Sequence, residues 1–386
     1  MKNKILKILS YVLVAALSAT VALGGSTLAQ WKSWSDSPKL QQLEQLILER
    51  FIGDADRTAL EDAAANAMIE AMGDRWSYYI SAEDYAAHME QMHNAYVGIG
   101  VTIQQREEGG FIITVVNAGG PAEVAGLLPE DVIVAVAGQS VLEMDASECR
   151  TLVRGEEGTT VEITVERAGQ RQSFMVERRT VQTPVATARL LEDCIGLVTI
   201  ENFDERCYDE SVAAIRELTQ QGATALIFDV RYNPGGYKTE LVKLLDYLLP
   251  EGELFHSEDY LGNTSVDRSD AACLELPMAV LVNGSSYSAA EFFAAALSEY
   301  EAAVIVGEKT SGKGYFQNTF RLSDGSAVAI STGRYTTPKG VSLEGVGITP
   351  DVIVEVDEQT AYGIYTGTLE PADDPQLQAA IAALRR

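Results

Sequence analysis

Three serines stand within four positions where an apolar run gives way to a helix-like run. Ser285, Ser286 and Ser288 lie between MAVLV and AAEFFAAALSEY. Ser288 fits a capping box with Glu291, in which the serine accepts a helix N–H and the glutamate reaches back to the cap residue. The position also suits a nucleophile, because the adjacent N–H groups and the helix dipole can stabilise a developing oxyanion. Taken alone, the stretch favours capping over catalysis.

A serine nucleophile needs a base, and two kinds of side chain could supply it. The histidines, His88, His93 and His256, lie outside any recognisable catalytic motif. A lysine kept neutral by burial could serve instead, because desolvation disfavours the charged amine and lowers its pKa. The segment GEKTSGKGYFQN supplies Lys309 and Lys313 as candidates.

The lysine segment also comes close to a phosphate-binding loop. Gly307, Gly312 and Lys313 match the pattern G-x-x-x-x-G-K-[ST] in register. Gly314 stands where the pattern needs a magnesium-binding Ser or Thr, and the residues after it are typical of a strand rather than a helix. Nucleotide binding is therefore disfavoured.

A tight turn follows the second strand expected in the C-terminal half. The stretch DVRYNPGGY, residues 229–237, contains Asn233-Pro234 followed by Gly235 and Gly236. Such a turn often does no more than connect two secondary-structure elements. It can also leave a glycine N–H pointing into a cleft, and ligands of open α/β sheets bind where strands end.

The secondary structure that would position these residues is predicted to change along the chain, from helices to strands. Apolar residues three and four positions apart predict amphipathic helices at 37–53 and 57–73, and a third helix is expected at 81–93. Short β-branched runs between glycine turns predict a mostly β module over 95–180.

Beyond this module the pattern alternates. From Ile195, strands are separated by helical runs, which predicts βαβ units and a largely parallel sheet. A hairpin is expected with its turn at Asp324-Gly325, and the tail is expected to end in a helix.

The composition argues against one class of partner. The 386 residues contain 56 acidic and 29 basic side chains, for a formal net charge of −27. Nucleic-acid binding needs clustered Lys and Arg, so no nucleic-acid partner is expected. The four cysteines lack a CxxC pair, which argues against a zinc knuckle or a thioredoxin-like motif. We interpret them as small buried residues, although the sequence also allows one disulfide between two of them. We expect no metal site.

Residues 1–29 have the layout of an export signal. Lys2, Lys4 and Lys7 precede an uncharged, mostly apolar stretch that ends in small residues. The run 8–28 is long enough to span a bilayer, so an uncleaved membrane anchor and a cleaved signal are equally open. In either case the rest of the chain is expected to be exported, at the cell surface or secreted.

Together these motifs resemble the carboxyl-terminal processing proteases, also called tail-specific proteases. Members of that family are exported serine peptidases with a Ser/Lys dyad and an inserted PDZ domain. The family's S-A-S-A-S-E motif is similar to the stretch 286–291, which implies that Ser288 is the nucleophile. Its T-F-G-K-G motif is similar to 310–314, which implies that Lys313 is the general base. Lys313 follows Ser288 by 25 residues, the spacing associated with the family.

The resemblance implies further site residues. A glutamine four positions after the lysine orients the amine in the family and is matched by Gln317, which an even offset along a strand would place on the same face as Lys313. DVRYNPGG is similar to a family turn that would supply one oxyanion N–H, the other coming from Ala289; the turn's candidates are Gly235 and Gly236. YVGIGV is similar to a PDZ loop that receives a peptide C-terminus while the peptide adds as a strand; its residues are Gly98, Ile99, Gly100 and Val101.

The implied fold class is α/β. A ClpP/crotonase-like βαβ protease domain would carry an inserted, mostly β PDZ domain and a small helical N-terminal region. The expected boundaries are 1–29 for the signal or anchor, 30–93 for the helical region, 94–182 for the PDZ domain, and 183–386 for the protease domain with its helical tail.

Four positions depart from the family pattern. Tyr287 replaces an alanine beside the nucleophile, Ala290 replaces a serine, Ser311 replaces a phenylalanine and Tyr232 replaces an asparagine. None of them removes a dyad residue. They bear on specificity and rate, and Tyr287 would narrow the cleft beside the scissile bond.

The implied function is a serine endopeptidase, without cofactor, that recognises unstructured protein C-termini through its PDZ domain and cleaves upstream of them. Membrane association through the N-terminal segment and homo-oligomerisation remain open. Two alternatives belong to other classes: a non-catalytic PDZ scaffold in which Ser288 only caps a helix, and a CoA-handling enzyme on a similar ββα architecture. The second would need a basic phosphate-binding cluster, which the sequence does not show.

Overall fold

The computed structural model describes residues 38–385, apart from 107 and 118. The chain divides into two compact units, with the boundary between Gly73 and Asp74. The export segment expected at 1–29 lies outside the described residues. No helix within the described part of the chain has both the length and the apolar content to cross a bilayer.

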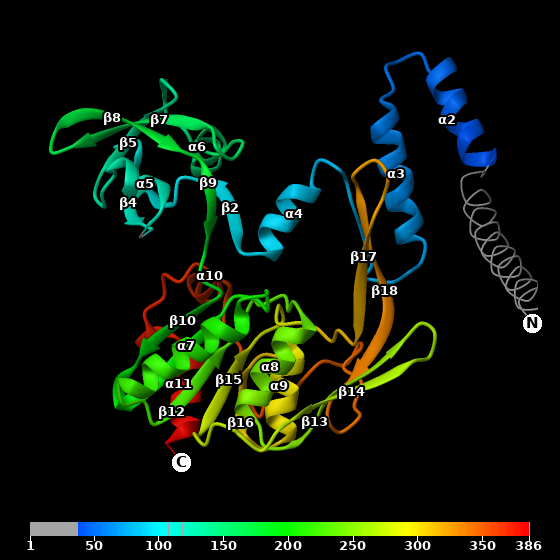
Figure 1. The fold of residues 1–386 in the computed structure, drawn as a ribbon, viewed down its shortest axis with the longest axis vertical. Coiled ribbons are helices and arrows are strands. Elements are labelled where there is room, and N and C mark those ends of the chain that lie inside the picture. Colours follow the sequence, from blue (N-terminus) through cyan, green and yellow to red (C-terminus); the bar gives the residue numbers. More distant parts are fainter. Residues whose placement is uncertain (1–37, 107, 118, 386) are drawn as a thin grey trace, which may run out of the picture. The chain divides into compact units, whose positions relative to one another are not determined.

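The described part of the first unit, from residue 38 on, contains two helices (Figure 1). α2 spans Pro38–Arg50 and α3 spans Arg57–Glu70, where the spacing of apolar residues predicts helices. The carboxylate of Asp56 caps α3 by accepting a hydrogen bond from the Ala59 N–H at 2.8 Å, which satisfies one donor left unpaired at the helix start. No residue of α3 is buried, so the apolar face expected there is not enclosed.

A mostly β module follows the third predicted helix, α4 (Tyr85–Met92). Its main sheet has the order β3-β4-β5-β7-β8, with β6 on β5, while β2 pairs with β9 where the chain enters and leaves. The core of the module contains Ile99, Phe111 and Ile163. Its elements are β2 (Ala95–Gly98), β3 (Val101–Gln105), β4 (Phe111–Val116), α5 (Pro121–Ala125), β5 (Val132–Val136), β6 (Gln139–Ser140), α6 (Ala146–Val153), β7 (Thr160–Arg167), β8 (Gln170–Glu177) and β9 (Arg179–Gln182).

The predicted alternation of strands and helices forms a six-stranded sheet in the order β10-β11-β12-β15-β16-β19. All its pairs are parallel except β10 with β11. The elements are β10 (Ala186–Leu190), β11 (Ile195–Ile200), α7 (Cys207–Gln220), β12 (Ala225–Asp229), α8 (Lys238–Leu248), β15 (Met278–Val282), α9 (Ala289–Glu299), β16 (Ala303–Gly307), β19 (Val352–Ile353) and α11 (Pro375–Leu384).

Both faces of this sheet are covered, which explains why its strands read as continuous apolar runs. Phe228 and Val280 pack with α7, α8 and α9 in one core. Their neighbours Ile227 and Leu281 point to the other face, because alternate residues of a strand face opposite ways, and pack with α11. Figure 1 shows α11 against the sheet, across from α8 and α9. The helical tail expected from the sequence is therefore part of the core.

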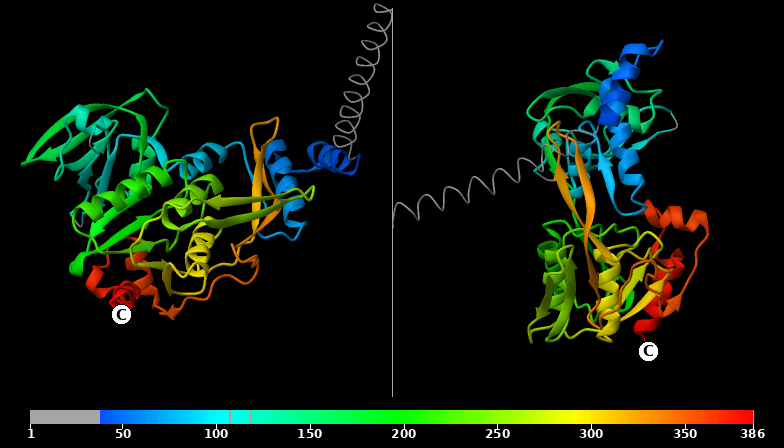
Figure 2. Two further views of the ribbon diagram at one scale, coloured as in Figure 1. Left: turned by 60° about the horizontal axis from the view of Figure 1, so that its bottom comes forward. Right: turned by 90° about the vertical axis from the view of Figure 1, so that its right-hand side faces the viewer.

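A second, antiparallel sheet has the order β1-β18-β13-β14, with β17 on β18. The hairpin predicted at Asp324-Gly325 joins β17 (Tyr315–Arg321) to β18 (Ala327–Thr336). The hairpin of β13 (Gly252–Asp259) and β14 (Thr264–Ser269) was not predicted. The remaining elements are β1 (Tyr78–Ile80), α10 (Glu358–Tyr365) and two short 3-10 turns, Glu192–Cys194 and Pro371–Asp373. Figure 2 shows β17 and β18 extending away from the six-stranded sheet.

The cysteines follow the predicted pattern only in part. Cys149 and Cys207 are buried apolar residues, as expected, and burial raises the pKa of the Cys149 thiol to about 11. Cys194 is exposed, contrary to expectation, because it lies in the turn before β11. All four cysteines are free thiols.

Candidate active site

The candidate residues come together at the carboxyl ends of three neighbouring strands. β12 is followed by the Asn-Pro-Gly-Gly turn, β15 by Ser288, and β16 by the loop that carries Lys313. Carboxyl ends of parallel strands meet at one edge of a sheet, where ligands of such folds bind. One large cavity at this edge is lined by all the predicted residues of the reaction centre: Gly235, Gly236, Ser288, Ala289, Lys313 and Gln317.

Ser288 has a strained backbone. Its φ of 57° and ψ of −122° fall in a region that residues with a Cβ rarely adopt. Such strain persists only where the surrounding structure enforces it, and it gathers at functional sites. The hydroxyl of Ser288 makes no capping hydrogen bond to α9, so the capping interpretation of this serine is wrong.

The other two serines of the cluster differ in role. Ser286 is buried; its hydroxyl donates to the Val230 carbonyl at 2.7 Å and accepts from the Asn283 N–H at 3.0 Å. It therefore fixes the turn between β15 and α9 against the end of β12. Ser285 is exposed, and its N–H donates to the Asn283 side chain at 3.1 Å. Both are turn residues.

Glu291 does not reach back to the start of its own helix. Its buried carboxylate instead accepts hydrogen bonds from the Gly312 N–H at 2.8 Å and the Lys313 N–H at 2.9 Å, and also from the Thr310 hydroxyl. Burial raises the pKa of Glu291, while these donors lower it. The predicted capping-box glutamate thus joins the first turn of α9, which follows Ser288, to the lysine loop.

The two candidate lysines are separated by their environments. Lys309 is exposed and does not line the cavity, whereas Lys313 is half-buried within it. Desolvation lowers the pKa of Lys313 to about 8, although the carboxylates of Asp74 and Glu344 act in the opposite direction. A strand, not a helix, follows the loop, so the phosphate-binding alternative lacks its helix.

The Lys313 amine lies near two aromatic rings. Its Nζ is 5.2 Å from the ring centroid of Trp76 and 5.6 Å from that of Tyr287. The two rings are stacked, with centroids 6.0 Å apart. These rings explain much of the desolvation of the amine, because they occupy space that water would otherwise fill.

A segment before the β module holds the lysine loop from outside. Arg75 donates to the carbonyls of Ser311 at 2.9 Å and Gly312 at 2.6 Å. The indole N–H of Trp76 donates to the Glu344 carboxylate at 3.0 Å, and the same carboxylate accepts from the Gly314 N–H at 2.7 Å. Sequence reasoning gave these residues no function. The only signal was the stretch GDRWSYY, which contains Arg75 and Trp76 and resembles a family segment that precedes the PDZ domain.

The Asn-Pro-Gly-Gly turn packs directly against the nucleophile. The carbonyl of Asn233 accepts from the Tyr287 N–H at 3.2 Å. Gly235 has a φ of 90°, and a Cβ at this position would lie 2.7 Å from the Ser288 Cβ and 2.8 Å from the Ala289 nitrogen. Only glycine fits so close to the start of α9, because any side chain would push the two turns apart.

The hydrogen bonds of the turn distinguish its two glycines. The N–H of Gly235 donates to the Asn233 side chain at 2.8 Å, so it is already used. Among the described residues, no acceptor takes the N–H of Gly236 or that of Ala289, the first residue of α9. Gly236 and Ala289 therefore offer two unpaired donors beside Ser288, as an oxyanion site needs.

Gln317 lines the same cavity but does not share a strand with Lys313. β17 begins at Tyr315, so Lys313 lies in the loop before the strand, where side chains do not alternate between two faces. The even-offset argument for a common face is therefore wrong. The side-chain amide of Gln317 donates to the Ser331 hydroxyl at 3.0 Å and to the Tyr315 carbonyl at 3.1 Å.

Of the histidines, only His88 lines the cavity, within the part of the chain described. Its ring packs against Tyr78, with centroids 5.8 Å apart. Burial lowers the pKa of His88, so this ring is neutral at physiological pH.

The predicted peptide-binding loop of the β module lies outside this cavity. Gly98 ends β2, Val101 begins β3, and Gly100 has a φ of 74°. The side chain of Ile99 is buried in the module's core. No acceptor in the described chain takes the N–H of Ile99 or Gly100, whereas their carbonyls accept from Ala122 and Asn117.

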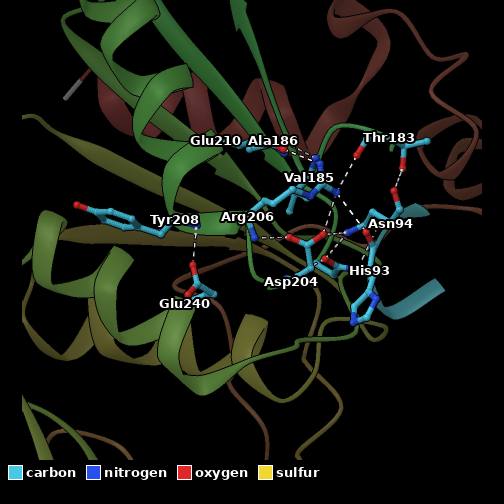
Figure 3. Close-up of polar contacts among 11 residues, drawn as sticks. His93, Asn94, Thr183, Val185, Ala186, Asp204, Arg206, Tyr208, Glu210 and Glu240 are labelled. Atoms are coloured by element: carbon cyan, nitrogen blue, oxygen red, sulfur yellow. Dashed lines mark hydrogen bonds and ion pairs between the residues drawn. The ribbon is translucent and has the colours of Figure 1, made fainter. Parts of the chain in front are cut away.

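A polar network holds the two chain crossings between the β module and the rest of the unit (Figure 3). Arg206 donates to the carbonyls of His93 at 3.3 Å and Thr183 at 3.1 Å, one on each crossing. It also pairs with the buried Asp204 at 2.9 Å. The amide of Asn94 donates to the same carboxylate at 2.9 Å. A single arginine thus contacts the chain where it enters the module and where it leaves.

Comparison with known proteins shows that the chain is similar to peptidases. The family model described as "Peptidase family S41" matches residues 194–354, and that of the PDZ domain matches residues 112–167. The carboxy-terminal processing protease CtpA of Bacillus subtilis is 31% identical over 364 residues, which cover 92% of this chain and 78% of that protein.

Two further proteins are similar. A probable CtpA-like serine protease of Staphylococcus haemolyticus is 32% identical over 297 residues, which cover 76% of this chain and 59% of that longer protein. The crystal structure of a Bacteroides fragilis protein described as an S41 protease matches 89% of this chain and 97% of its own, with 18% identity and a TM-score of 0.56. The latter similarity shows the shared fold.

Proposed function

The chain belongs to the carboxy-terminal processing proteases of peptidase family S41, and on that premise we propose that it cuts proteins with Ser288 as nucleophile and Lys313 as general base. The observation that carries the proposal is the position of the Lys313 amine. It is desolvated in the cavity that Ser288 lines, and Glu291 joins its loop to the helix that starts after Ser288. The positions of Ser288 and Lys313 are thereby fixed relative to each other.

The reaction begins with neutral Lys313. A group with a pKa of about 8 is neutral in about one molecule in ten at pH 7, which is enough for a base that is renewed in each cycle. The amine takes the Ser288 proton, and the serine oxygen attacks the peptide carbonyl. The lysine then protonates the leaving amine, and water, activated by the same base, hydrolyses the acyl-enzyme.

The tetrahedral anion is stabilised by backbone donors. We assign this role to the N–H groups of Gly236 and Ala289, because both are unpaired in the described structure and Gly235 is not. The start of α9 adds its positive dipole end at the same point. Gln317 is proposed to orient the Lys313 amine through its side-chain carbonyl, since its amide N–H groups already donate to Ser331 and Tyr315.

Substrate choice is proposed to lie with the PDZ domain. The unpaired N–H groups of Ile99 and Gly100, in the loop from Gly98 to Val101, would donate hydrogen bonds to the carboxylate of an unstructured C-terminus while the peptide adds as a strand. The proposed division is 30–93, 94–182 and 183–386, with 1–29 directing export and providing either a cleaved signal or a membrane anchor.

The test uses an unfolded protein substrate in two forms, one with a free C-terminus and one with an amidated C-terminus. Wild type and Ser288→Ala are incubated with each form, and the fragments are identified by mass. The proposal predicts cleavage by wild type only, and faster cleavage of the free-carboxylate form. Equal turnover by Ser288→Ala would contradict the nucleophile, and equal cleavage of both forms would contradict the PDZ assignment. Absence of cleavage by wild type would favour a PDZ scaffold.

A further inference from the structure

Tyr335, on β18, is a cavity residue that the reaction described above does not use. Its side chain is 4% exposed, and its ring packs against Phe255 and Phe292 with centroids 5.3 Å and 5.7 Å away. It lines the same cavity as Ser288 and Lys313. A buried phenol needs a hydrogen-bond partner, so the contacts of its hydroxyl show what it holds.

Tyr335 makes two hydrogen bonds to the loop that carries Lys313. The phenol O–H donates to the carbonyl of Lys313, and the backbone N–H of Tyr335 donates to the carbonyl of Gly314 at 3.0 Å. Two donors of one residue therefore fix two successive carbonyls of the loop. The carbonyl of Lys313 is held from β18 while its N–H is held by Glu291 from α9.

Tyr335 also lies in the same cavity as the proposed nucleophile, Ser288. Burial raises the pKa of Tyr335, and the nearby Ser288 hydroxyl lowers it. The phenol proton is engaged with Lys313, so its oxygen is left to accept from the serine hydroxyl. The raised pKa disfavours the phenolate form, so Tyr335 is not suited to act as a general base.

We propose that Tyr335 is a positioning residue that joins the dyad through one chain of hydrogen bonds, from the Ser288 hydroxyl to the phenol and from the phenol to the Lys313 carbonyl. This inference rests on the proposed Ser/Lys mechanism. The phenol holds the serine oxygen in one rotamer and fixes the base of the lysine side chain. Both reacting groups are thereby placed before substrate arrives, and misplacement by about 1 Å is enough to cost about 100-fold in rate.

The test is Tyr335→Phe, which keeps the ring between Phe255 and Phe292 and removes only the hydroxyl. The matched control is Tyr300→Phe, since Tyr300 also donates its phenol proton to a backbone carbonyl, that of Glu253 at 2.9 Å, but does not line the cavity. Three quantities are measured for each: kcat and KM on a short peptide, and the rate at which a fluorophosphonate labels Ser288.

Tyr335→Phe is expected to lower kcat and the labelling rate about 10- to 100-fold with KM changed less than about threefold, because positioning acts on the reacting groups. Tyr300→Phe is expected to match wild type in all three. If wild type and Tyr335→Phe label at the same rate, this inference is wrong while the dyad stands. If wild type does not label at all, the proposed function itself fails.

A second measurement does not depend on activity. Thermal unfolding is compared for wild type, Ser288→Ala, Tyr335→Phe and the double variant. A shared hydrogen bond predicts that Tyr335→Phe costs less Tm in the Ser288→Ala background than in wild type, because the bond is already broken there. Equal losses in the two backgrounds would show that Ser288 and Tyr335 do not interact.

Discussion

Glu291 accepts a hydrogen bond from the backbone N–H of Lys313 at 2.9 Å, although the two residues belong to different elements. Glu291 lies in the first turn of α9, three residues after Ser288, and Lys313 lies in the loop between β16 and β17. The serine and its base are therefore positioned by a single buried carboxylate.

Glu291→Gln tests that carboxylate. One oxygen accepts from Thr310 and Gly312 and the other from Lys313, so glutamine must present its NH₂ to at least one donor. We expect the free energy of unfolding to fall by about 1–3 kcal/mol, with a loss of kcat. Glu217→Gln, on the exposed face of α7, should change stability by less than about 0.5 kcal/mol. Denaturant titration compares the two, and equal stability would contradict the role of Glu291.

Lys313→Met should stabilise the protein while abolishing activity. The folded pKa of Lys313, about 8, lies below the unfolded value of 10.5, so the folded state binds fewer protons between these values and gains stability as pH rises through that window. Below it, at pH 7, the fold carries the cost of a desolvated charge. Removing the amine should therefore raise stability at pH 7 by about 1–3 kcal/mol. A lower Tm for Lys313→Met at pH 7, measured by calorimetry, would show that the amine is not strained.

Gly235→Ala should separate the oxyanion turn from the nucleophile. Its Cβ would lie 2.7 Å from that of Ser288, in addition to the strain of a φ of 90°. Gly262→Ala is the matched control, because Gly262 has a φ of 82° with no atom within 4 Å of the added Cβ. The control should lose only about 1 kcal/mol and keep its activity, whereas Gly235→Ala should lose more stability and most activity. Equal behaviour in unfolding and peptidase assays would mean that the close approach has no consequence.

Arg206→Gln should weaken the network at the two chain crossings in Figure 3. The variant leaves the buried charge of Asp204 without its ion-pair partner, so we expect a loss of about 3 kcal/mol in the free energy of unfolding. Arg268→Gln breaks an exposed pair with Glu253 and should cost less than about 1 kcal/mol. Urea titration gives both values, and a loss for Arg206→Gln no larger than that of the control would rule out a stabilising role for the network.

The sequence was most informative where local patterns decide the structure. Alternating apolar and helical runs specified the strands β11, β12, β15 and β16, because a sheet buried on both faces needs continuous apolar strands. Motif spacing also selected Ser288 and Lys313, which the fold brings into one cavity. Both kinds of signal are carried by residues close together in the chain.

The features that the sequence did not predict depend on contacts between segments far apart in the chain. Ser288 and Glu291 match a capping box in sequence, but the approach of the lysine loop gives Glu291 three other donors. Tyr335 contacts Lys313 only because β18 lies next to the loop that carries Lys313. Gln317 was placed on one face with Lys313 by counting residues along a strand, but Lys313 lies in the loop before β17, where the alternation of strand faces does not apply.

The most direct test of the central claim is the pH dependence of Ser288 acylation. The rate at which a fluorophosphonate modifies Ser288, located by mass, is measured from pH 5 to 10 for wild type and Lys313→Arg. With Lys313 as base, the wild-type rate rises about tenfold per pH unit and levels off near the lysine's pKa of about 8, while Lys313→Arg stays unlabelled because guanidinium does not deprotonate. A flat wild-type profile, or labelling of Lys313→Arg at the wild-type rate, would contradict the dyad.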